Sequence, residues 1–343
     1  MDSSKFIPVK AAVLGDGGWG TAQAIMLAQN GHDVTLWGAF ADNIEAIRRD
    51  KENRRFLPGV KFPDKLKVTA NIGEAVKGAS IVVMASPSQF LRGTLNAFKP
   101  YFKREKQILL DISKGIEVGT LLRMSELTAE ILGKAKYAVL SGPSHAEEVS
   151  RNIPTAVVAA SNDLRIAKHI QSVFMNDMFR VYTSRDVAGV ELGGALKNVY
   201  AVAAGMLDGM GLGDNTKAAL MTRGIAEMAR LGKRLNGQQK TFSGLSGAGD
   251  LIVTCTSKHS RNNRAGQLIG QGVPALEAIE QIGTVEGYEC VKIALKLARE
   301  KDVDIPIFEQ LYKICYEGLT PKEALQVLMQ RPQRHEQECY WEV

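Results

Sequence analysis

The sequence predicts an α/β protein in which an N-terminal domain with a parallel sheet precedes an all-helical C-terminal domain. The first half alternates short β-rich runs with helical stretches, whereas from about residue 186 the pattern is helical throughout. Such alternation is typical of parallel strands joined by right-handed crossovers. A length of 343 residues suits two domains. We expect them at residues 1–186 and 187–343.

The expected strands of the first domain are short and rich in β-branched and other apolar residues. The run SIVVMA at residues 80–85 is almost wholly apolar, as expected for a strand covered on both faces. A helix is expected over residues 22–29, ending at Asn30-Gly31. The remaining strands are expected at residues 10–14, 33–37, 107–111, 137–141, 155–160 and 179–183.

The second domain is expected to be built around one buried helix over residues 191–209, which is small and apolar around most of its circumference. Residues 220–231 have an amphipathic helical pattern. Thr320 as N-cap and Pro321 at the first helical position predict another helix start. The polar tail from about residue 331 is expected to be frayed.

Composition indicates a soluble, cytoplasmic globular protein. Hydrophobic residues make up 45% and charged residues 23% of the chain, and no apolar run is long enough for membrane insertion. The net charge of +6 comes from scattered Lys and Arg without interleaved aromatics, which favours small phosphorylated ligands over nucleic acid. The 4 cysteines form no CxxC pair and the 5 histidines no metal-ligand spacing, so we expect reduced thiols and no metal site.

A glycine motif between the first expected strand and helix indicates the first ligand. Gly15, Gly17 and Gly20 form G-x-G-x-x-G, with GDGGWG as the full segment. These glycines permit a tight turn, close approach of the backbone to a pyrophosphate, and close packing of helix on strand. The helix N-terminus offers unpaired N–H groups to phosphates. The first domain is therefore predicted to be a Rossmann-type domain that binds NAD or NADP.

The end of the second strand leaves the choice between NAD and NADP open. An acid about 20 residues after the glycines usually binds the ribose 2′-hydroxyl of NAD. Here the strand ends in WGAF, residues 37–40, without Asp, Glu or a following Arg. Arg48 and Arg49 lie nearby and are expected on a solvated helix face.

Lys197, within the apolar helix, is the candidate acid/base residue. Its neighbours at helical spacing are small or apolar: Gly193, Gly194, Tyr200 and Ala201. Desolvation disfavours the ammonium form and is expected to lower the pKa of this lysine, as suits a base in alcohol oxidation. The alternative is a structural lysine paired with a carboxylate at a domain seam. Asn198 beside it could bind substrate or satisfy helix contacts.

A second polar cluster lies at residues 246–264. Asp250 is either a helix N-cap or a carboxylate that orients Lys197 or bonds the substrate, and Thr254 shares its helix face. Arg261 and Asn262 suit a phosphate dianion, but from these residues alone a solvated polar loop is the better explanation.

Together these segments resemble the NAD(P)-dependent glycerol-3-phosphate dehydrogenases of the bacterial biosynthetic type, from about residue 10 to about residue 328. The matching stretches occur in the family's order: GDGGWGTA, PSQ, SKGIE, SGPSHAEEV, ELGGALKNVYAVAAGMLDG, LMTRGIAEMARLG, GLSGAGDLIVTCTS and SRNNR. The resemblance implies interconversion of sn-glycerol 3-phosphate and dihydroxyacetone phosphate by a homodimer that supplies phospholipid synthesis.

The resemblance also implies site roles, with Lys197 as general acid/base. The implied substrate contacts are Lys114, Gly142, Ser144, Lys197, Asn198, Asp250, Thr254, Ser260, Arg261 and Asn262. The implied cofactor contacts are Gly15, Gly17, Gly18, Trp19, Gly20, Phe40, Lys114, Ala146, Arg261 and Glu286. His145 departs from the Phe that is usual in SGPSFA, and we interpret it as a neutral variation.

Two other functions remain open on sequence grounds. Related 3-hydroxy acid dehydrogenases also combine a dinucleotide domain, a helical domain and a helix lysine, but lack the phosphate-suited SRNNR loop. A non-catalytic NAD(P)H sensor would need neither Lys197 nor Asp250.

Overall fold

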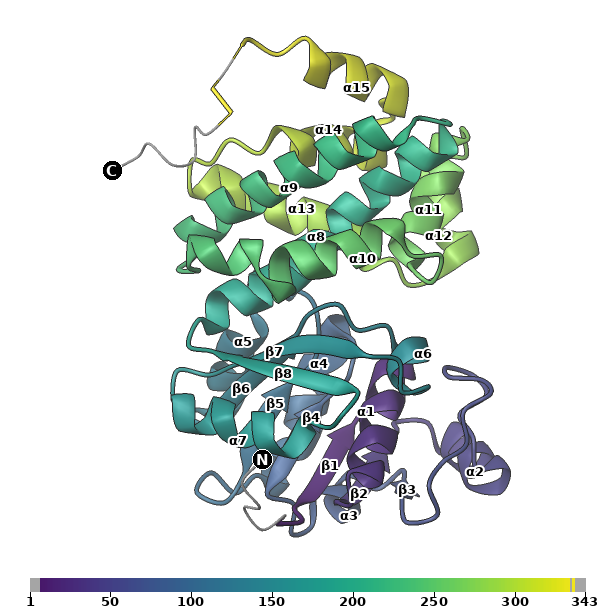
Figure 1. Ribbon diagram of the computed structural model, residues 1–343, viewed down its shortest axis with the longest axis vertical. Helices are drawn as coiled ribbons and strands as arrows, with labels where there is room; N and C mark the ends of the chain where they lie inside the picture. The colour runs from purple at the N-terminus through teal and green to yellow at the C-terminus, as the bar shows by residue number, and fades with distance from the viewer. Residues whose placement is uncertain (1–6, 334, 337–343) are drawn as a thin grey trace. The chain divides into compact units, whose positions relative to one another are not determined.

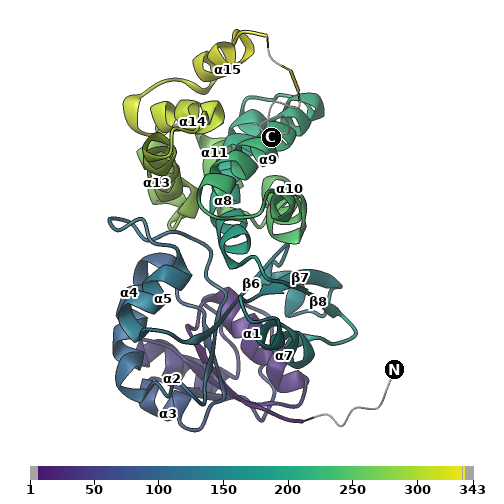
Figure 2. The same ribbon diagram turned by 90° about the vertical axis from the view of Figure 1, so that its left-hand side faces the viewer.

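The computed structural model describes residues 7–333, 335 and 336, and the chain divides into two compact units. The first comprises Met1–Glu117 and Leu122–Val187, and the second comprises Val118–Leu121 and Ala188–Val343. The strands belong to the first unit, and long helices make up the second (Figures 1 and 2). Part of the tail expected to be frayed, residues 334 and 337–343, lies outside the described residues.

One eight-stranded sheet forms the centre of the first unit, in the order β3-β2-β1-β4-β5-β6-β7-β8. Neighbouring strands are parallel except β6 and β7, which are antiparallel. The expectation of a parallel sheet is wrong for this one pair. The connection from β6 to β7 contains only the four-residue α6, which is too short for a helical crossover. The strands are β1 Lys10–Leu14, β2 Asp33–Trp37, β3 Lys67–Thr69, β4 Ile81–Met84, β5 Ile108–Asp111, β6 Lys136–Ser141, β7 Thr155–Ala160 and β8 Phe179–Ser184.

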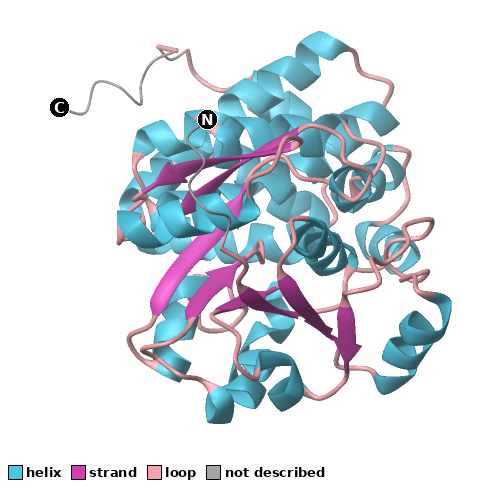
Figure 3. Cartoon of the chain, turned by 60° about the horizontal axis from the view of Figure 1, so that its bottom comes forward, coloured by secondary structure: helices cyan, strands magenta, loops and turns pink. Residues whose placement is uncertain are grey.

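Helices cover both faces of this sheet (Figure 3). One buried cluster packs α1 and α7 against the sheet, and a second packs α3, α4 and α5 against the other face. The strands are therefore apolar on both sides, as the run at residues 80–85 predicted. The helices are α1 Gly18–Gln29, α2 Ala41–Asp50, α3 Ile72–Val76, α4 Ser88–Phe98, α5 Met124–Leu132, α6 Ala146–Val149 and α7 Leu164–Phe174, with a 3-10 turn at Lys99–Tyr101.

The second unit is helical, as predicted, and α8 (Val187–Gly209) is buried from its start to Leu207. Glycines of α8 and of the helices packed on it let their backbones approach closely. A Cβ on Gly205 would lie 2.0 Å from the carbonyl oxygen of Asn263, and one on Gly287 would lie 2.4 Å from that of Asn198. The other helices are α9 Asp214–Arg234, α10 Asp250–Thr256, α11 Arg261–Gly270, α12 Ala275–Ile282, α13 Glu286–Glu300, α14 Pro306–Glu317 and α15 Pro321–Met329.

Two sequence expectations about local structure are confirmed. The hydroxyl of Thr320 caps α15 by accepting from the backbone N–H of Glu323, and Pro321 is the first helical residue. Arg48 and Arg49 lie on the exposed face of α2. Within the described residues, no helix is both long and apolar enough to span a membrane.

A buried carboxyl group lies in the core of the helical unit. Glu227 on α9 accepts hydrogen bonds from the backbone N–H of Ile307 at 2.9 Å and from the hydroxyl of Tyr200 at 3.2 Å. Burial raises the pKa of Glu227 from 4.5 to about 7, because desolvation penalises the carboxylate. Burial likewise raises the pKa of the Tyr200 hydroxyl well above 10.0. The protonated carboxyl is therefore the form that the fold favours.

Glu227→Gln is expected to flatten the pH dependence of stability. Since the folded pKa lies above the unfolded one, the stabilisation is complete below pH 4.5 and is lost as the pH rises through about 7. The loss amounts to about 3 kcal/mol, and the neutral amide avoids it. Urea midpoints followed by circular dichroism should favour the variant at pH 8 and coincide near pH 5. The exposed Glu280→Gln control should follow the wild type throughout, and equal profiles for all three proteins would contradict the assignment.

Candidate active site

The glycine loop between β1 and α1 has the geometry of a phosphate cradle. Gly15 has φ +136°, and a Cβ there would lie 2.6 Å from the carbonyl carbon of Ala85. A Cβ on Gly20 would lie 2.0 Å from the carbonyl oxygen of Gly15, so helix and strand touch at this point. Nothing lies within 4 Å of a Cβ built on Gly17. The loop is thus closely packed at Gly15 and Gly20 and open at Gly17, where a pyrophosphate can approach the backbone.

The first turn of α1 adds donors to this cradle. Gly17 is the N-cap, so the first N–H groups of the helix have no intrahelical partner and carry the positive end of its dipole. The indole Nε1 of Trp19 is buried and has no hydrogen-bond partner among the described residues. Gly18 lies 3.7 Å from Ala146, measured from a built Cβ, while Phe40 is 66% exposed just beyond β2. These features fit a dinucleotide.

A buried asparagine that sequence reasoning missed holds the loop in place. The amide of Asn53 donates to the carbonyl oxygen of Asp16 at 2.7 Å and to the hydroxyl of Thr21 at 2.9 Å. Asn53 is fully buried. It lies more than 30 residues from the loop in sequence, inside a polar stretch that carries no recognisable pattern, so only the fold reveals this role.

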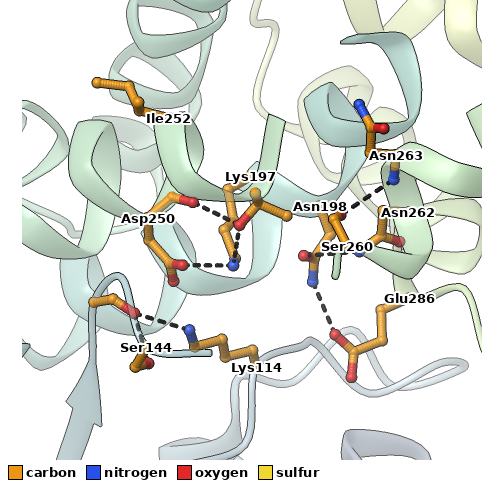
Figure 4. Close-up of polar contacts among 12 residues, drawn as sticks. Lys114, Ser144, Lys197, Asn198, Asp250, Ile252, Ser260, Asn262, Asn263 and Glu286 are labelled. Atoms are coloured by element: carbon orange, nitrogen blue, oxygen red, sulfur yellow. Dashed lines mark hydrogen bonds and ion pairs between the residues drawn. The ribbon is translucent and has the colours of Figure 1, made fainter. Parts of the chain in front are cut away.

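Three expected substrate contacts meet within the first unit. The ammonium group of Lys114 donates to the carbonyl oxygen of Gly142 at 3.1 Å, and the hydroxyl of Ser144 donates to the same oxygen at 2.8 Å (Figure 4). Gly142 has φ +142°, and a Cβ there would lie 3.0 Å from the Cα of Val157. The carbonyl oxygen of Gly142 therefore holds the ammonium group of Lys114 and the hydroxyl of Ser144 close together at the end of β6.

In the second unit, Lys197 lies in a buried polar contact with two residues of α10. Its ammonium group is 2.6 Å from Oδ1 of Asp250 and 2.6 Å from the hydroxyl of Thr254 (Figure 4). The side chains of Lys197 and Asp250 are 7% and 2% exposed. The hydroxyl of Thr254 in turn donates to the backbone carbonyl of Asp250 at 2.6 Å. The carboxylate supplies a counter-charge, so the lysine is not the isolated group on an apolar face that its own helix suggests.

Asp250 is not a helix N-cap. It already has helical φ and ψ, because a π-helical turn at Leu245–Gly249 leads into α10. This turn lies directly against α8, where a Cβ on Gly193 would be 2.5 Å from the carbonyl oxygen of Ser246. Close backbone approach is what brings the carboxylate within reach of Lys197, and it explains the small residues one turn before the lysine.

Next to this pair, a chain of amide hydrogen bonds joins three helices. Asn198 donates to Oε2 of Glu286 at 2.9 Å and accepts from the amide of Asn262 at 3.1 Å. The side-chain oxygen of Asn262 accepts from the backbone N–H of Gly287 at 2.9 Å. The arrangement ties α8 to the N-terminal turns of α11 and α13, so these residues, predicted as substrate and cofactor contacts, form one network.

The two remaining predicted residues lie where α11 begins. The hydroxyl of Ser260 caps the helix by accepting from the N–H of Asn263 at 3.1 Å. Arg261, the first residue of α11, is exposed, and its guanidinium group makes no hydrogen bond or ion pair with any described residue. A helix N-terminus and an uncommitted guanidinium are both suited to an anion.

A dinucleotide cradle on a doubly covered sheet, together with a helical unit that buries a lysine against a carboxylate, fits a nicotinamide-dependent oxidoreductase. The chain belongs to the NAD-dependent glycerol-3-phosphate dehydrogenase family. The model of the family's N-terminal part matches residues 10–167, and that of its C-terminal part matches residues 186–326.

Individual relatives resemble this chain over nearly its full length. Glycerol-3-phosphate dehydrogenase (NAD(P)+) of Syntrophomonas wolfei is 47% identical over 331 residues, 95% of this chain and 96% of that protein. The protein of the same name from Carboxydothermus hydrogenoformans is 49% identical over 331 residues, 96% and 98% of the two chains. A crystal structure of glycerol-3-phosphate dehydrogenase from Coxiella burnetii superimposes with a TM-score of 0.90 at 38% identity, covering 94% of this chain and 99% of that one.

Proposed function

We propose that this protein interconverts sn-glycerol 3-phosphate and dihydroxyacetone phosphate, with NAD(P) as the redox partner. The observation that carries the proposal is the buried contact of Lys197 with Asp250 and Thr254, in a chain that also has a dinucleotide cradle. When bound, the nicotinamide accepts or supplies the hydride. Gly15, Gly17, Gly18, Trp19 and Gly20 would hold the dinucleotide, with Phe40, Ala146 and Glu286 as further contacts.

Lys197 is the general acid/base of this proposal. During oxidation its neutral amine takes the proton of the C2 hydroxyl as hydride leaves that carbon. During reduction the ammonium group returns a proton to the carbonyl oxygen, which becomes the hydroxyl. The carboxylate of Asp250, 2.6 Å away, stabilises the ammonium form, and Thr254 fixes the direction of the amine.

The phosphate of the substrate is assigned to the start of α11. The guanidinium of Arg261 is exposed and uncommitted, and it adjoins helix-terminal N–H groups and the amide of Asn262. Lys114, Gly142, Ser144, Asn198 and Ser260 are the other proposed substrate contacts.

Arg261→Ala is expected to raise KM for dihydroxyacetone phosphate by roughly 10–100-fold, the worth of one charge-assisted contact. The value of kcat should change far less, because the arginine holds the ground state and the transition state alike. Steady-state kinetics measure both constants. Arg264→Ala, exposed one turn along the same helix, is the matched control. An unchanged KM in the Arg261 variant would remove this residue from the phosphate site.

The reaction itself is tested by following oxidation of NADH and of NADPH with dihydroxyacetone phosphate. Turnover of at least one cofactor is expected, and glycerol 3-phosphate should drive the reverse reaction. Activity confined to an unphosphorylated 3-hydroxy acid would contradict the substrate assignment. Binding of NAD(P)H without turnover of a triose phosphate would contradict the enzymatic role.

Three further points belong to the same proposal. We place the enzyme in supply of glycerol 3-phosphate for phospholipid synthesis, in keeping with its family. A cytoplasmic location is supported by the free, buried thiols of Cys255, Cys290 and Cys315, as expected in a reducing compartment. A homodimer is supported by the exposed apolar side chains of Val327 and Met329 on α15, and light scattering would measure its mass.

A further inference from the structure

The end of β2 carries no acid, yet a carboxylate occupies that place. Gly38 follows β2 directly, and a Cβ built on it would lie 2.5 Å from Oδ2 of Asp16. Asp16 belongs to the glycine loop, between Gly15 and Gly17. The missing side chain at residue 38 therefore leaves room for the carboxylate of residue 16. The chain has an acid at the tip of β2, supplied by another segment.

A hydrogen bond holds one of the two oxygens of the Asp16 carboxylate. The amide of Asn43, in the first turn of α2, donates to Oδ2 of Asp16 at 2.6 Å. Across the described part of the chain, no hydrogen bond reaches the other oxygen, Oδ1. Asp16 is 8% exposed, so its direction is fixed by packing. One oxygen anchors the side chain and the second remains available as an acceptor.

No described cation pairs with this carboxylate, and the two arginines of α2 are committed elsewhere. The guanidinium of Arg48 donates to the carbonyl oxygen of Val68 at 2.9 Å and pairs with Glu45. Arg49 pairs with Asp50 at 2.8 Å. Neither arginine of α2 is thus free to receive a 2′-phosphate, while a carboxylate lies at the tip of β2.

We propose that Asp16 binds the adenosine ribose and selects NAD over NADP. In dinucleotide folds the acid at the tip of the second strand accepts a hydrogen bond from the ribose 2′-hydroxyl. A carboxylate at that place repels a 2′-phosphate, whose charge would lie beside it without a compensating donor. The inference rests on the proposed dinucleotide function and goes beyond it, since it names the preferred cofactor and the residue responsible.

A purely structural role predicts something different. If Asp16 only anchored Asn43 and the start of α2, its loss would weaken both dinucleotides equally. Selection by charge instead predicts opposite effects on the two. The ratio of the two dissociation constants therefore separates these roles, and it requires no catalytic turnover.

The experiment measures equilibrium dissociation constants for NADH and NADPH by calorimetry. The wild type is expected to bind NADH at least about tenfold more tightly, the worth of one charge-assisted contact. Asp16→Asn and Asp16→Ala should weaken NADH binding, strengthen NADPH binding and lower this preference by at least about tenfold. Asn43→Ala keeps the charge and should keep the preference. Asp42→Asn removes a neighbouring exposed charge and should leave both constants unchanged.

Each outcome has a distinct meaning. Equal affinity of the wild type for NADH and NADPH, or its preference for NADPH, overturns the inference even if no variant folds. Equal weakening of both cofactors in the Asp16 variants assigns the residue to structure alone and also overturns it. Failure of the wild type to bind either dinucleotide instead overturns the proposed function.

Discussion

Lys197→Ala is expected to lower kcat by roughly 10²–10⁴-fold, which corresponds to a loss of about 3–5 kcal/mol in transition-state stabilisation. The variant lacks the group that we propose exchanges a proton with the substrate oxygen. The affinity for NADH should remain nearly unchanged, because the cradle lies on a different segment, at the start of α1. Steady-state kinetics and calorimetry measure the two effects separately.

Stability has to be controlled in this experiment, because the substitution leaves a buried carboxylate unpaired. Asp250 is 2% exposed on its side chain, and removing one partner of such a pair costs about 3–5 kcal/mol. The double variant Lys197→Met with Asp250→Asn removes both charges and should recover stability without recovering turnover. Lys296→Ala, exposed on α13, should behave as the wild type. Near-normal turnover in the folded Lys197→Ala protein would exclude the lysine as acid/base.

Gly20→Ala and Gly17→Ala are expected to have different effects on stability and on NADH binding. A methyl group on Gly20 would lie 2.0 Å from the carbonyl oxygen of Gly15, and backbone cannot move aside as a flexible side chain can. We expect a loss of about 3 kcal/mol in stability, which lowers Tm by roughly 6–12 °C, together with loss of NADH binding. Thermal unfolding followed by circular dichroism measures the first effect.

Gly17 provides the contrasting case within the same loop. Its φ of −64° suits any residue, and nothing lies within 4 Å of the added methyl group. Tm should therefore stay near the wild-type value. NADH binding should weaken at least about tenfold, since the methyl group projects where a pyrophosphate must approach the backbone. Unchanged NADH affinity in this folded variant would show that the pyrophosphate does not lie against Gly17.

Local patterns in the sequence determined the class of fold. Strands covered on both faces must be apolar along their length, and the glycine loop needs a strand before it and a helix after it, so these elements could be located without the structure. β3 was missed because three residues, Lys67–Thr69, are too few to show a period. The antiparallel pairing of β6 with β7 depends on how their connection folds, which neither strand encodes by itself.

The candidate site shows the same division between local and distant information. The sequence indicated Lys197 as the candidate acid/base residue, because its spacing and its neighbours belong to a single helix. The sequence could not decide whether Asp250 is the partner of Lys197 or a helix N-cap. The answer depends on a π-helical turn that packs against Gly193. Asn53 likewise binds a loop more than 30 residues away in sequence. Asp16 belongs to the glycine loop, but its carboxylate lies at the tip of β2. Residue types and the periodic spacing of apolar residues are properties of a single segment. Hydrogen-bond partners, counter-charges and filled spaces arise only when separate segments pack together.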